Sequence, residues 1–292
     1  MTVNQSHVRS AAIQERRLPL YFTRNIRSYL VLLFLAVLFL TPFYWMITTA
    51  LKTEAQLFQI PPAWIPNPLA WENFTQVFKE VPFARFILNS SFLVTINVAG
   101  QVFATTMVAY GFSRFQFPGR DVLFVILLAT LMIPKQVVLV PQFILFAKLG
   151  WVNTYLPLIL PAFGGSPFLI FMVRQYMMSI PIDLDEAAMI DGASRWQILW
   201  RIIFPISIPI LVLVVVFTFV DVWNDFMGPL IYLNDPLKFT VSLGLSFFQG
   251  AKETSWQLLM AAALMAMLPP IILFLIAQRR LLGGIAAAGI KG

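Results

Sequence analysis

The sequence predicts an all-α membrane protein with six membrane-spanning helices. Of its 292 residues, 59% are hydrophobic and only 11% are charged, whereas a soluble domain carries about 25% charged residues. Six runs with few or no charges are long enough to cross a bilayer, which takes about 20 residues. They are residues 29–50, 86–112, 122–147, 149–173, 202–220 and 254–278. Residues 29–278 are therefore expected to form the transmembrane domain.

The distribution of arginine and lysine predicts the orientation. The two tails (1–28 and 279–292) and the two loops on the same side as the tails hold 13 of the 20 lysines and arginines. The loops on the other side, which include residues 51–85 and 223–253, hold six. Because positive loops stay in the cytoplasm, both termini are expected to be cytoplasmic.

The same composition argues against several functions. The chain has no cysteine and one histidine, His7, in a polar tail, so disulfides, thiol catalysis and thiolate metal sites are excluded. The sequence has no G-x-x-x-x-G-K-[ST] loop to hold phosphates. We expect no catalytic residue, cofactor or metal. The net charge of +7 does not indicate a nucleic-acid partner, since in a membrane chain the placement of charge matters more than its sum.

Two spans carry polar groups that must avoid lipid. Residues 86–112 hold many amide and hydroxyl side chains, which predicts a helix inside the bundle. In residues 122–147, Pro134 and Pro141 are expected to bend or break the helix. Lys135 lies near the middle of this span, where an unpaired charge costs about 2.5–3.5 kcal/mol. A structural anchor and a residue of a translocation path are both consistent with Lys135.

Residues 181–205 predict two short helices joined by a turn, in a loop on the positive side. Asp183 followed by Glu186 three residues later predicts a capping box at the start of the first helix. Gly192 is suited to end this helix in the left-handed conformation. Ser194 is expected to cap the second helix.

The spacing within this segment is specific. Glu186, Ala187 and Ala188 are followed after three residues by Gly192, and nine residues later by Ile202, Ile203, Phe204 and Pro205. This resembles the EAA motif of membrane subunits of ABC importers, with Phe204 in place of the usual Leu. Pro205 is also expected in the first turn of the fifth span. The resemblance implies a cytoplasmic helix that docks into a separate ATPase, and its coupling residues are Glu186, Ala187, Ala188, Asp191, Gly192 and Pro205.

Further motifs resemble carbohydrate-importer permeases of the maltose type. The run 223–226 reads WNDF, where that group has WNEF, and residues 283–292 resemble its GL-x-x-GAVKG tail. The resemblance implies the type I ABC importer permease fold in the shorter, six-span subunit, in the inner membrane of a prokaryote. The implied partners are a second homologous permease, two ATPase subunits, an extracellular or periplasmic solute-binding protein, a sugar and membrane lipid. The tail residues Gly289, Ile290, Lys291 and Gly292 would also contact the ATPases.

The sequence pattern that indicates a substrate path is less specific than these motifs. Aromatic faces can stack on sugar C–H surfaces, and amides or carboxylates can bind hydroxyls. The residues that offer this chemistry are Asp221, Trp223, Asn224 and Asp225, with Lys135. An aromatic girdle at the membrane surface explains the cluster as well. In the loop that follows, Tyr232, Phe239, Phe247 and Phe248 are candidate contacts for the binding protein. An ABC permease for a non-sugar solute and a stand-alone secondary transporter remain alternatives.

Overall fold

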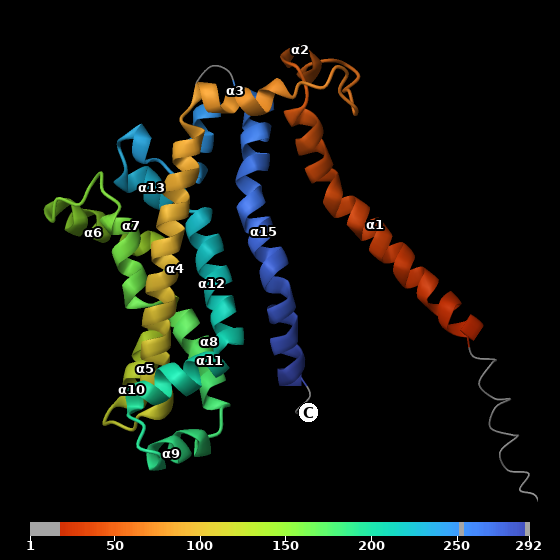
Figure 1. Cartoon of the computed structure of the whole chain (residues 1–292). Helices are drawn as coiled ribbons and strands as arrows, with labels where there is room; N and C mark the ends of the chain where they lie inside the picture. The colour runs from red at the N-terminus through yellow and green to blue at the C-terminus, as the bar shows by residue number, and fades with distance from the viewer. Residues whose placement is uncertain (1–17, 251–253, 290–292) are drawn as a thin grey trace, which may run out of the picture.

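The computed structural model describes residues 18–250 and 254–289, which form a helical bundle without extended strands in that part of the chain (Figure 1). The long helices are α1 (Leu18–Ala50), α4 (Phe83–Arg114), α12 (Ile208–Trp223) and α15 (Trp256–Gly289). Four stretches of helix are long and apolar enough to cross a membrane, and two bent helix pairs make six if each pair is one span. The predicted fold class is confirmed.

Shorter elements connect the long helices. Between α1 and α4 lie α2 (Glu54–Leu57) and α3 (Glu72–Glu80). Between α4 and α12 lie α5 (Arg120–Ala129), η1 (Thr130–Met132), α6 (Lys135–Lys148), α7 (Leu156–Ile159), η2 (Leu160–Gly164), α8 (Pro167–Met178), α9 (Asp183–Ile190), α10 (Arg195–Ile198), the π-helix η3 (Leu199–Ile203) and α11 (Phe204–Ile206). Between α12 and α15 lie α13 (Met227–Tyr232), η4 (Pro236–Lys238), α14 (Val241–Gly244) and η5 (Leu245–Phe248).

Helix α4 lies at the centre of the bundle and packs against α8 and α12. Five of its polar residues are buried, as expected for a helix largely shielded from lipid: Asn89, Ser90, Asn97, Thr105 and Thr106. Asn89 donates from Nδ2 to the carbonyls of Leu237 and Phe239, at 2.9 Å each. The Ser90 hydroxyl accepts from the backbone N–H of Val241 at 2.8 Å. These bonds fix the loop before α14 onto one end of α4.

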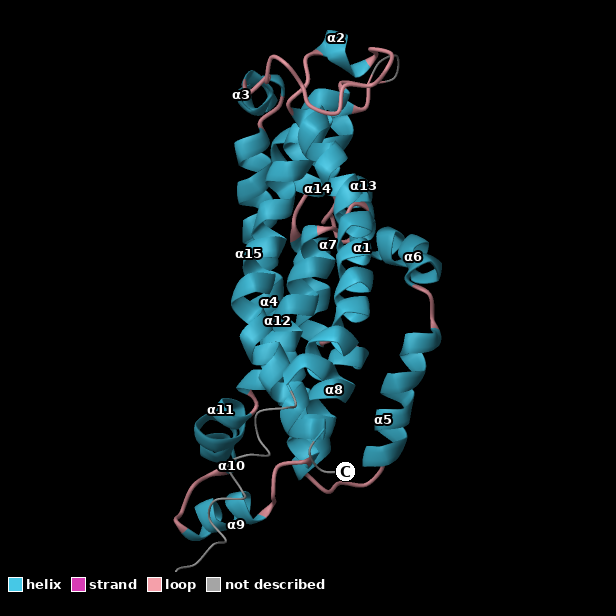
Figure 2. Cartoon of the chain, turned by 90° about the vertical axis from the view of Figure 1, so that its right-hand side faces the viewer, coloured by secondary structure: helices cyan, strands magenta, loops and turns pink. Residues whose placement is uncertain are grey.

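The third predicted span is broken into two helices. The axes of the α5–η1 stretch and α6 differ by 98°, and α6 turns away at the upper end of α5 (Figure 2). The break falls at Pro134, as expected from its missing N–H, but Pro141 lies inside continuous helix. The fourth span begins at Leu156 rather than at residue 149, since residues 149–155 form a turn after α6.

Both ends of the described chain are more helical than the sequence indicates. Helix α1 begins at Leu18, inside the expected tail 1–28, and α15 continues to Gly289, inside the expected tail 279–292. Helix α15 also runs without interruption through Pro269 and Pro270. Figure 1 shows α1 meeting the bundle at its upper end and leaning away below.

Close packing at Gly244 gives a first prediction. A Cβ added there would overlap the ring of Phe86, whose side chain is fully buried. We expect Gly244→Ala to destabilise the purified chain by about 1–3 kcal/mol, the usual cost of overpacking. Gly111→Ala is the matched control, because nothing lies within 4 Å of a Cβ at that position in α4. Thermal unfolding checks the pair, and equal midpoints would contradict the prediction.

Candidate functional site

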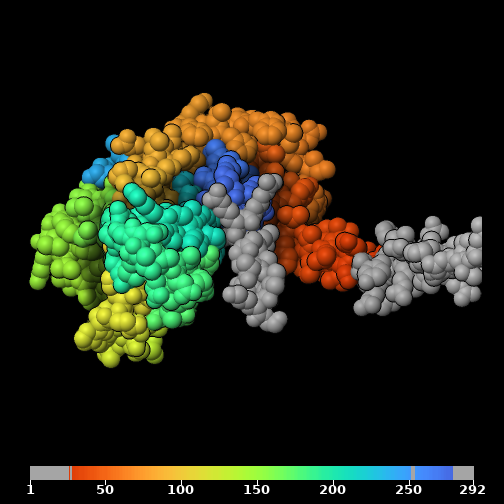
Figure 3. All heavy atoms as spheres, turned by 60° about the horizontal axis from the view of Figure 1, so that its bottom comes forward, coloured from red at the N-terminus to blue at the C-terminus, as the bar shows by residue number. Residues whose placement is uncertain are grey.

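Residues 181–205, here called the coupling segment, form the lower end of the bundle in Figure 1. Figure 3 shows these residues at the surface, beside the residues that join α4 to α5. Gly192 has φ +83°, so the predicted left-handed turn is confirmed. The predicted cap at Ser194 is confirmed as well. Its hydroxyl accepts from the N–H of Gln197 at 3.3 Å, and the Gln197 side chain accepts from the N–H of Ser194 at 2.8 Å.

Two local predictions for the coupling segment are wrong. Asp183 does not cap α9: Ile182 occupies the N-cap position, and Asp183 lies in the first turn. Asp183, Asp185 and Glu186 therefore act there as acidic groups at the positive end of the helix. Pro205 lies in the first turn of short α11, but the long membrane helix α12 begins only at Ile208. A bend of 77° separates the two, and Pro209 occupies the first turn of α12.

The exposed face of the coupling segment carries small and acidic groups beside large apolar side chains, namely those of Ile182, Leu184, Met189, Ile190 and Trp196. Glu186, Ala187, Asp191 and Gly192 are exposed, and Ala188 is half-buried. Pro205 is exposed on α11. Small side chains allow another protein to approach the backbone closely, so this face is suited to docking.

The inward face contains an ion pair that the motif does not include. Nε of Arg114, at the end of α4, lies 3.1 Å from Oδ2 of Asp185, and both side chains are buried. Burial raises the pKa of the Asp185 carboxyl, although Arg114 and Arg195 lower it. The raised pKa means that ionised Asp185 does not favour folding near neutral pH. A buried ion pair of this kind is weak evidence for added stability, because the cost of desolvating both charges offsets their attraction.

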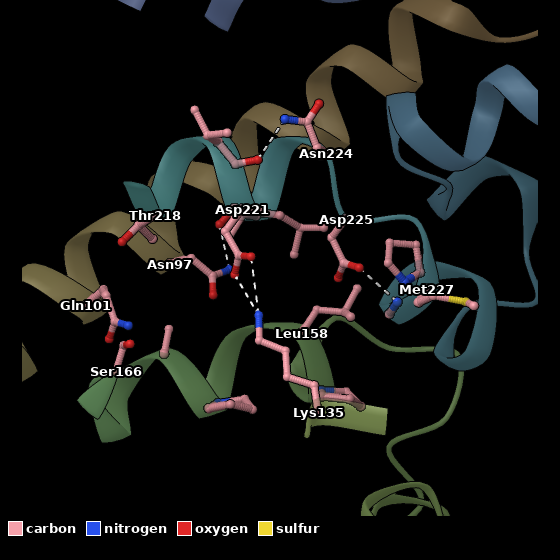
Figure 4. A pocket seen from close by; sticks show the side chains of 18 of the residues that line it. Asn97, Gln101, Lys135, Leu158, Ser166, Thr218, Asp221, Asn224, Asp225 and Met227 are labelled. Carbon is pink, nitrogen blue, oxygen red and sulfur yellow. Dashed lines mark hydrogen bonds and ion pairs between the residues drawn. The ribbon is translucent and has the colours of Figure 1, made fainter. Parts of the chain in front are cut away.

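A cavity of about 1150 Å³, with a mainly apolar lining and a few polar side chains, lies between α4, α6, α7, α8, α12 and α13 (Figure 4). Lys135, the first residue of α6, extends across it toward α12, and its Nζ lies 3.3 Å from Oδ1 of Asp221. The two side chains are 86% and 71% exposed, so the pair faces the cavity rather than the core. Pairing in a wet cavity is one of the ways to offset the cost of a charge at this depth.

The sequence placed four residues near the end of α12 on the substrate path, and three of them line this cavity. These are Asp221 itself, Asn224 and Asp225. Asn224 donates to the carbonyl of Val220 at 2.9 Å, and Oδ1 of Asp225 accepts from the N–H of Gly228 at 3.0 Å. Asp225 thus also holds the turn into α13.

Trp223 does not line the cavity. It is 3% exposed, stacks on Phe219, and donates from Nε1 to the carbonyl of Ala266 at 3.0 Å. Its indole therefore joins α12 to α15 on the far side of α12. An indole can be placed in a core or at an interface, and the local sequence does not distinguish the two.

Sequence reasoning missed polar residues that α4 and α12 present to the cavity. Asn97 and Gln101 are four residues apart on α4 and so share one face. Gln101 Oε1 and Thr218 Oγ1 are buried without a hydrogen-bond partner among the described residues. Buried polar atoms are normally hydrogen-bonded, and these two belong to residues that line the cavity. The four-residue spacing was the available signal.

The structure also bears on the aromatic residues expected to contact a binding protein and on the C-terminal tail. In the loop after α12, Tyr232 and Phe248 are each 5% exposed, so they are core residues and not contacts for a partner. Phe247, 46% exposed, remains a candidate. In the C-terminal tail, Gly289 ends α15, while Ile290, Lys291 and Gly292 lie outside the described residues.

Comparison with known proteins identifies the family. Residues 75–285 match the model described as "Binding-protein-dependent transport system inner membrane component". The probable ABC transporter permease protein YurM of Bacillus subtilis is 36% identical, over 86% of this chain and 83% of its own length. The trehalose/maltose transport system permease protein MalG of Thermococcus litoralis is 32% identical, over 88% and 94%.

A solved structure has the same fold. A chain of a bacterial ABC transporter that imports the acidic polysaccharide alginate superposes with a TM-score of 0.78, over 96% of this chain and 99% of that one, at 20% identity. Fold, apolar helices and family match agree along most of the chain. This protein belongs to the family of inner-membrane permease components of binding-protein-dependent transport systems.

Proposed function

We propose that this chain is one of two homologous permease subunits of a prokaryotic ABC importer for sugars. Two separate ATPase subunits supply the energy, and an extracellular or periplasmic binding protein delivers the sugar. Family membership supports the importer, and relatives over 30% identical include a trehalose/maltose permease. The segments on the side of both tails and the coupling segment hold 13 of the 20 lysines and arginines, which supports a cytoplasmic location for all three.

The proposed function depends chiefly on the structure of the coupling segment. Glu186, Ala187, Ala188, Asp191 and Gly192 are proposed to meet an ATPase, with Pro205 fixing the path back to the membrane. The exposed acidic and small side chains of α9 and its turn support this contact. The tail residues Gly289, Ile290, Lys291 and Gly292 are proposed as a second contact with the ATPases.

The cavity is proposed as part of the sugar path. Lys135, Asp221, Asn224 and Asp225 line it, and so do the polar residues of α4. Sugar hydroxyls both donate and accept, so they can satisfy Gln101 Oε1 and Thr218 Oγ1. Closure of the ATPases would move the coupling segment, and the bundle would then expose the cavity to the opposite side of the membrane.

Purification with partners tests the function. The chain, copurified with its ATPases and second permease and reconstituted in vesicles, is expected to import sugar only with ATP and the binding protein present. Uptake by the chain alone, without ATP, would instead show a secondary transporter. ATP-driven uptake of a non-sugar solute, with no sugar taken up, would show an ABC permease of another specificity.

Two buried threonines give a matched test of the sugar path. Thr218 and Thr106 both have buried hydroxyls without a partner among the described residues, but only Thr218 lines the cavity. Thr218→Val is expected to slow uptake at saturating binding protein by about twofold to tenfold, since one hydrogen bond contributes about 0.5–1.5 kcal/mol. Thr106→Val should have no such effect. Equal rates in both variants would remove Thr218 from the path.

A further inference from the structure

The ion pair beneath α9 is the starting point. Asp185 is the one residue of α9 that is fully buried, and it meets Arg114 rather than an apolar side chain. The neighbours Leu184 and Ile190 are 42% and 86% exposed. On the inner face of this helix, the buried ion pair therefore lies beside one half-buried apolar contact, Ala188, which packs on the bundle core.

The same end of α4 makes two more contacts, one to the residue just before the coupling segment and one within it. Nη2 of Arg114 donates to the carbonyl of Ile180 at 3.0 Å, just before α9. One turn earlier on α4, the Tyr110 hydroxyl donates to the carbonyl of Arg195 at 3.2 Å, in α10. These contacts therefore hold the chain both before and after the turn at Gly192.

Helix α4 leads from these contacts to the cavity. It is unbroken from Phe83 to Arg114 and carries Asn97 and Gln101 on the cavity wall. The 13 residues from Gln101 to Arg114 span about 20 Å at 1.5 Å per residue. The covalent route into α12 is less direct, because it passes through the π-helix Leu199–Ile203 and the 77° bend before Ile208.

We propose that Arg114, Asp185 and Tyr110 form a strut that makes the coupling segment and α4 move as one body. Displacement of the segment then reaches Asn97 and Gln101 at the cavity wall. The three act as positioning residues in this proposal, since none of them lines the cavity. That the ATPases displace the coupling segment rests on the proposed function. The rigid connection between this segment and α4 does not.

A charged strut fixes one orientation. The Asp185 carboxylate accepts no well-aligned hydrogen bond from the described residues, so attraction to Arg114 decides where α9 lies. Arg195 is the other cation that acts on Asp185. Removing one partner leaves the other charge buried and unpaired, so α9 should separate from α4.

The absence of cysteine from the sequence allows a direct test. Spin labels at Leu88→Cys in α4 and Ile190→Cys in α9, both exposed positions, report the distance between the two helices. In the purified complex the distribution of this distance is expected to be narrow. Its mean should be the same with and without trapped ATP. Asp185→Asn should broaden it. Asp121→Asn, in the exposed pair Arg120–Asp121, is the matched control and should not.

Transport gives the second readout. Asp185→Asn is expected to lower sugar imported per ATP hydrolysed at least about fivefold, the low end of typical coupling energies, while the ATPases still copurify. The swap Arg114→Asp with Asp185→Arg should restore most of the ratio. If Asp185→Asn does not fold, Tyr110→Phe, which removes only the bond to Arg195, should broaden the distance to a smaller extent.

The outcomes separate this proposal from the proposed function. A distance that stays narrow in Asp185→Asn, or in Tyr110→Phe where that variant replaces it, overturns the strut. So does an unchanged transport ratio. If the unaltered complex imports no sugar with ATP, the proposed function fails, and the label distances still decide whether α4 and α9 form one body.

Discussion

Replacing Gly192 by valine is expected to abolish ATP-driven uptake while leaving the chain inserted in the membrane. Gly192 has φ +83°, and nothing lies within 4 Å of a Cβ built there. The effect therefore comes from the backbone and not from a clash. An L residue in the left-handed region costs about 1–2 kcal/mol, and a β-branched one is especially unfavourable there. Relief of this strain would redirect α10 relative to α9.

Gly150→Val is the matched control for this prediction. Gly150 has φ +70° and equally open surroundings, but it lies in the turn after α6, away from the coupling segment. The two variants should lose similar stability, measured by thermal unfolding, and only Gly192→Val should lose uptake. Full ATP-dependent uptake in Gly192→Val would contradict the coupling role.

Removing the charge of Lys135 is expected to reduce uptake by at least about tenfold. Lys135→Gln leaves Asp221 without the cation 3.3 Å away. A charge near the membrane centre costs about 2.5–3.5 kcal/mol, and because both side chains of this pair are mostly exposed to the cavity, water screens part of that cost. Even half of that cost is close to the 1.36 kcal/mol that corresponds to about tenfold in rate. The cavity would then have to rearrange before it could admit sugar.

Two further variants decide whether the pair itself matters. The double change Lys135→Asp with Asp221→Lys restores opposite charges and should recover much of the uptake. Lys148→Gln, at the other end of α6, removes a lysine outside the cavity and should leave uptake unchanged. If Lys135→Gln transports as well as Lys148→Gln, the pair has no role in transport.

The sequence predicts the fold class well because lipid imposes simple requirements. Long uncharged runs and the polar face of α4 follow from the absence of water in the bilayer. The turn at Gly192 and the cap at Ser194 are also local, since each depends on one residue and its immediate neighbours. These features are confirmed in the structure.

Pairings between distant residues could not be predicted in the same way. Nothing local indicates that Arg114 meets Asp185, or that Lys135 finds Asp221 across a broken helix. Trp223 shows the converse problem. Its position in a recognisable motif pointed to the sugar path, whereas packing against α15 places it in the core. Such outcomes depend on tertiary contacts, which a single sequence does not record.

Labelling of one cysteine in the coupling segment tests the central claim most directly. Ala187→Cys would be the sole cysteine in the chain, at an exposed position. A membrane-impermeant maleimide is expected to label it in inside-out vesicles but not in right-side-out cells. The ATPase subunits should slow that labelling. Labelling from outside, or at the same rate with the ATPases bound, would contradict a cytoplasmic coupling segment.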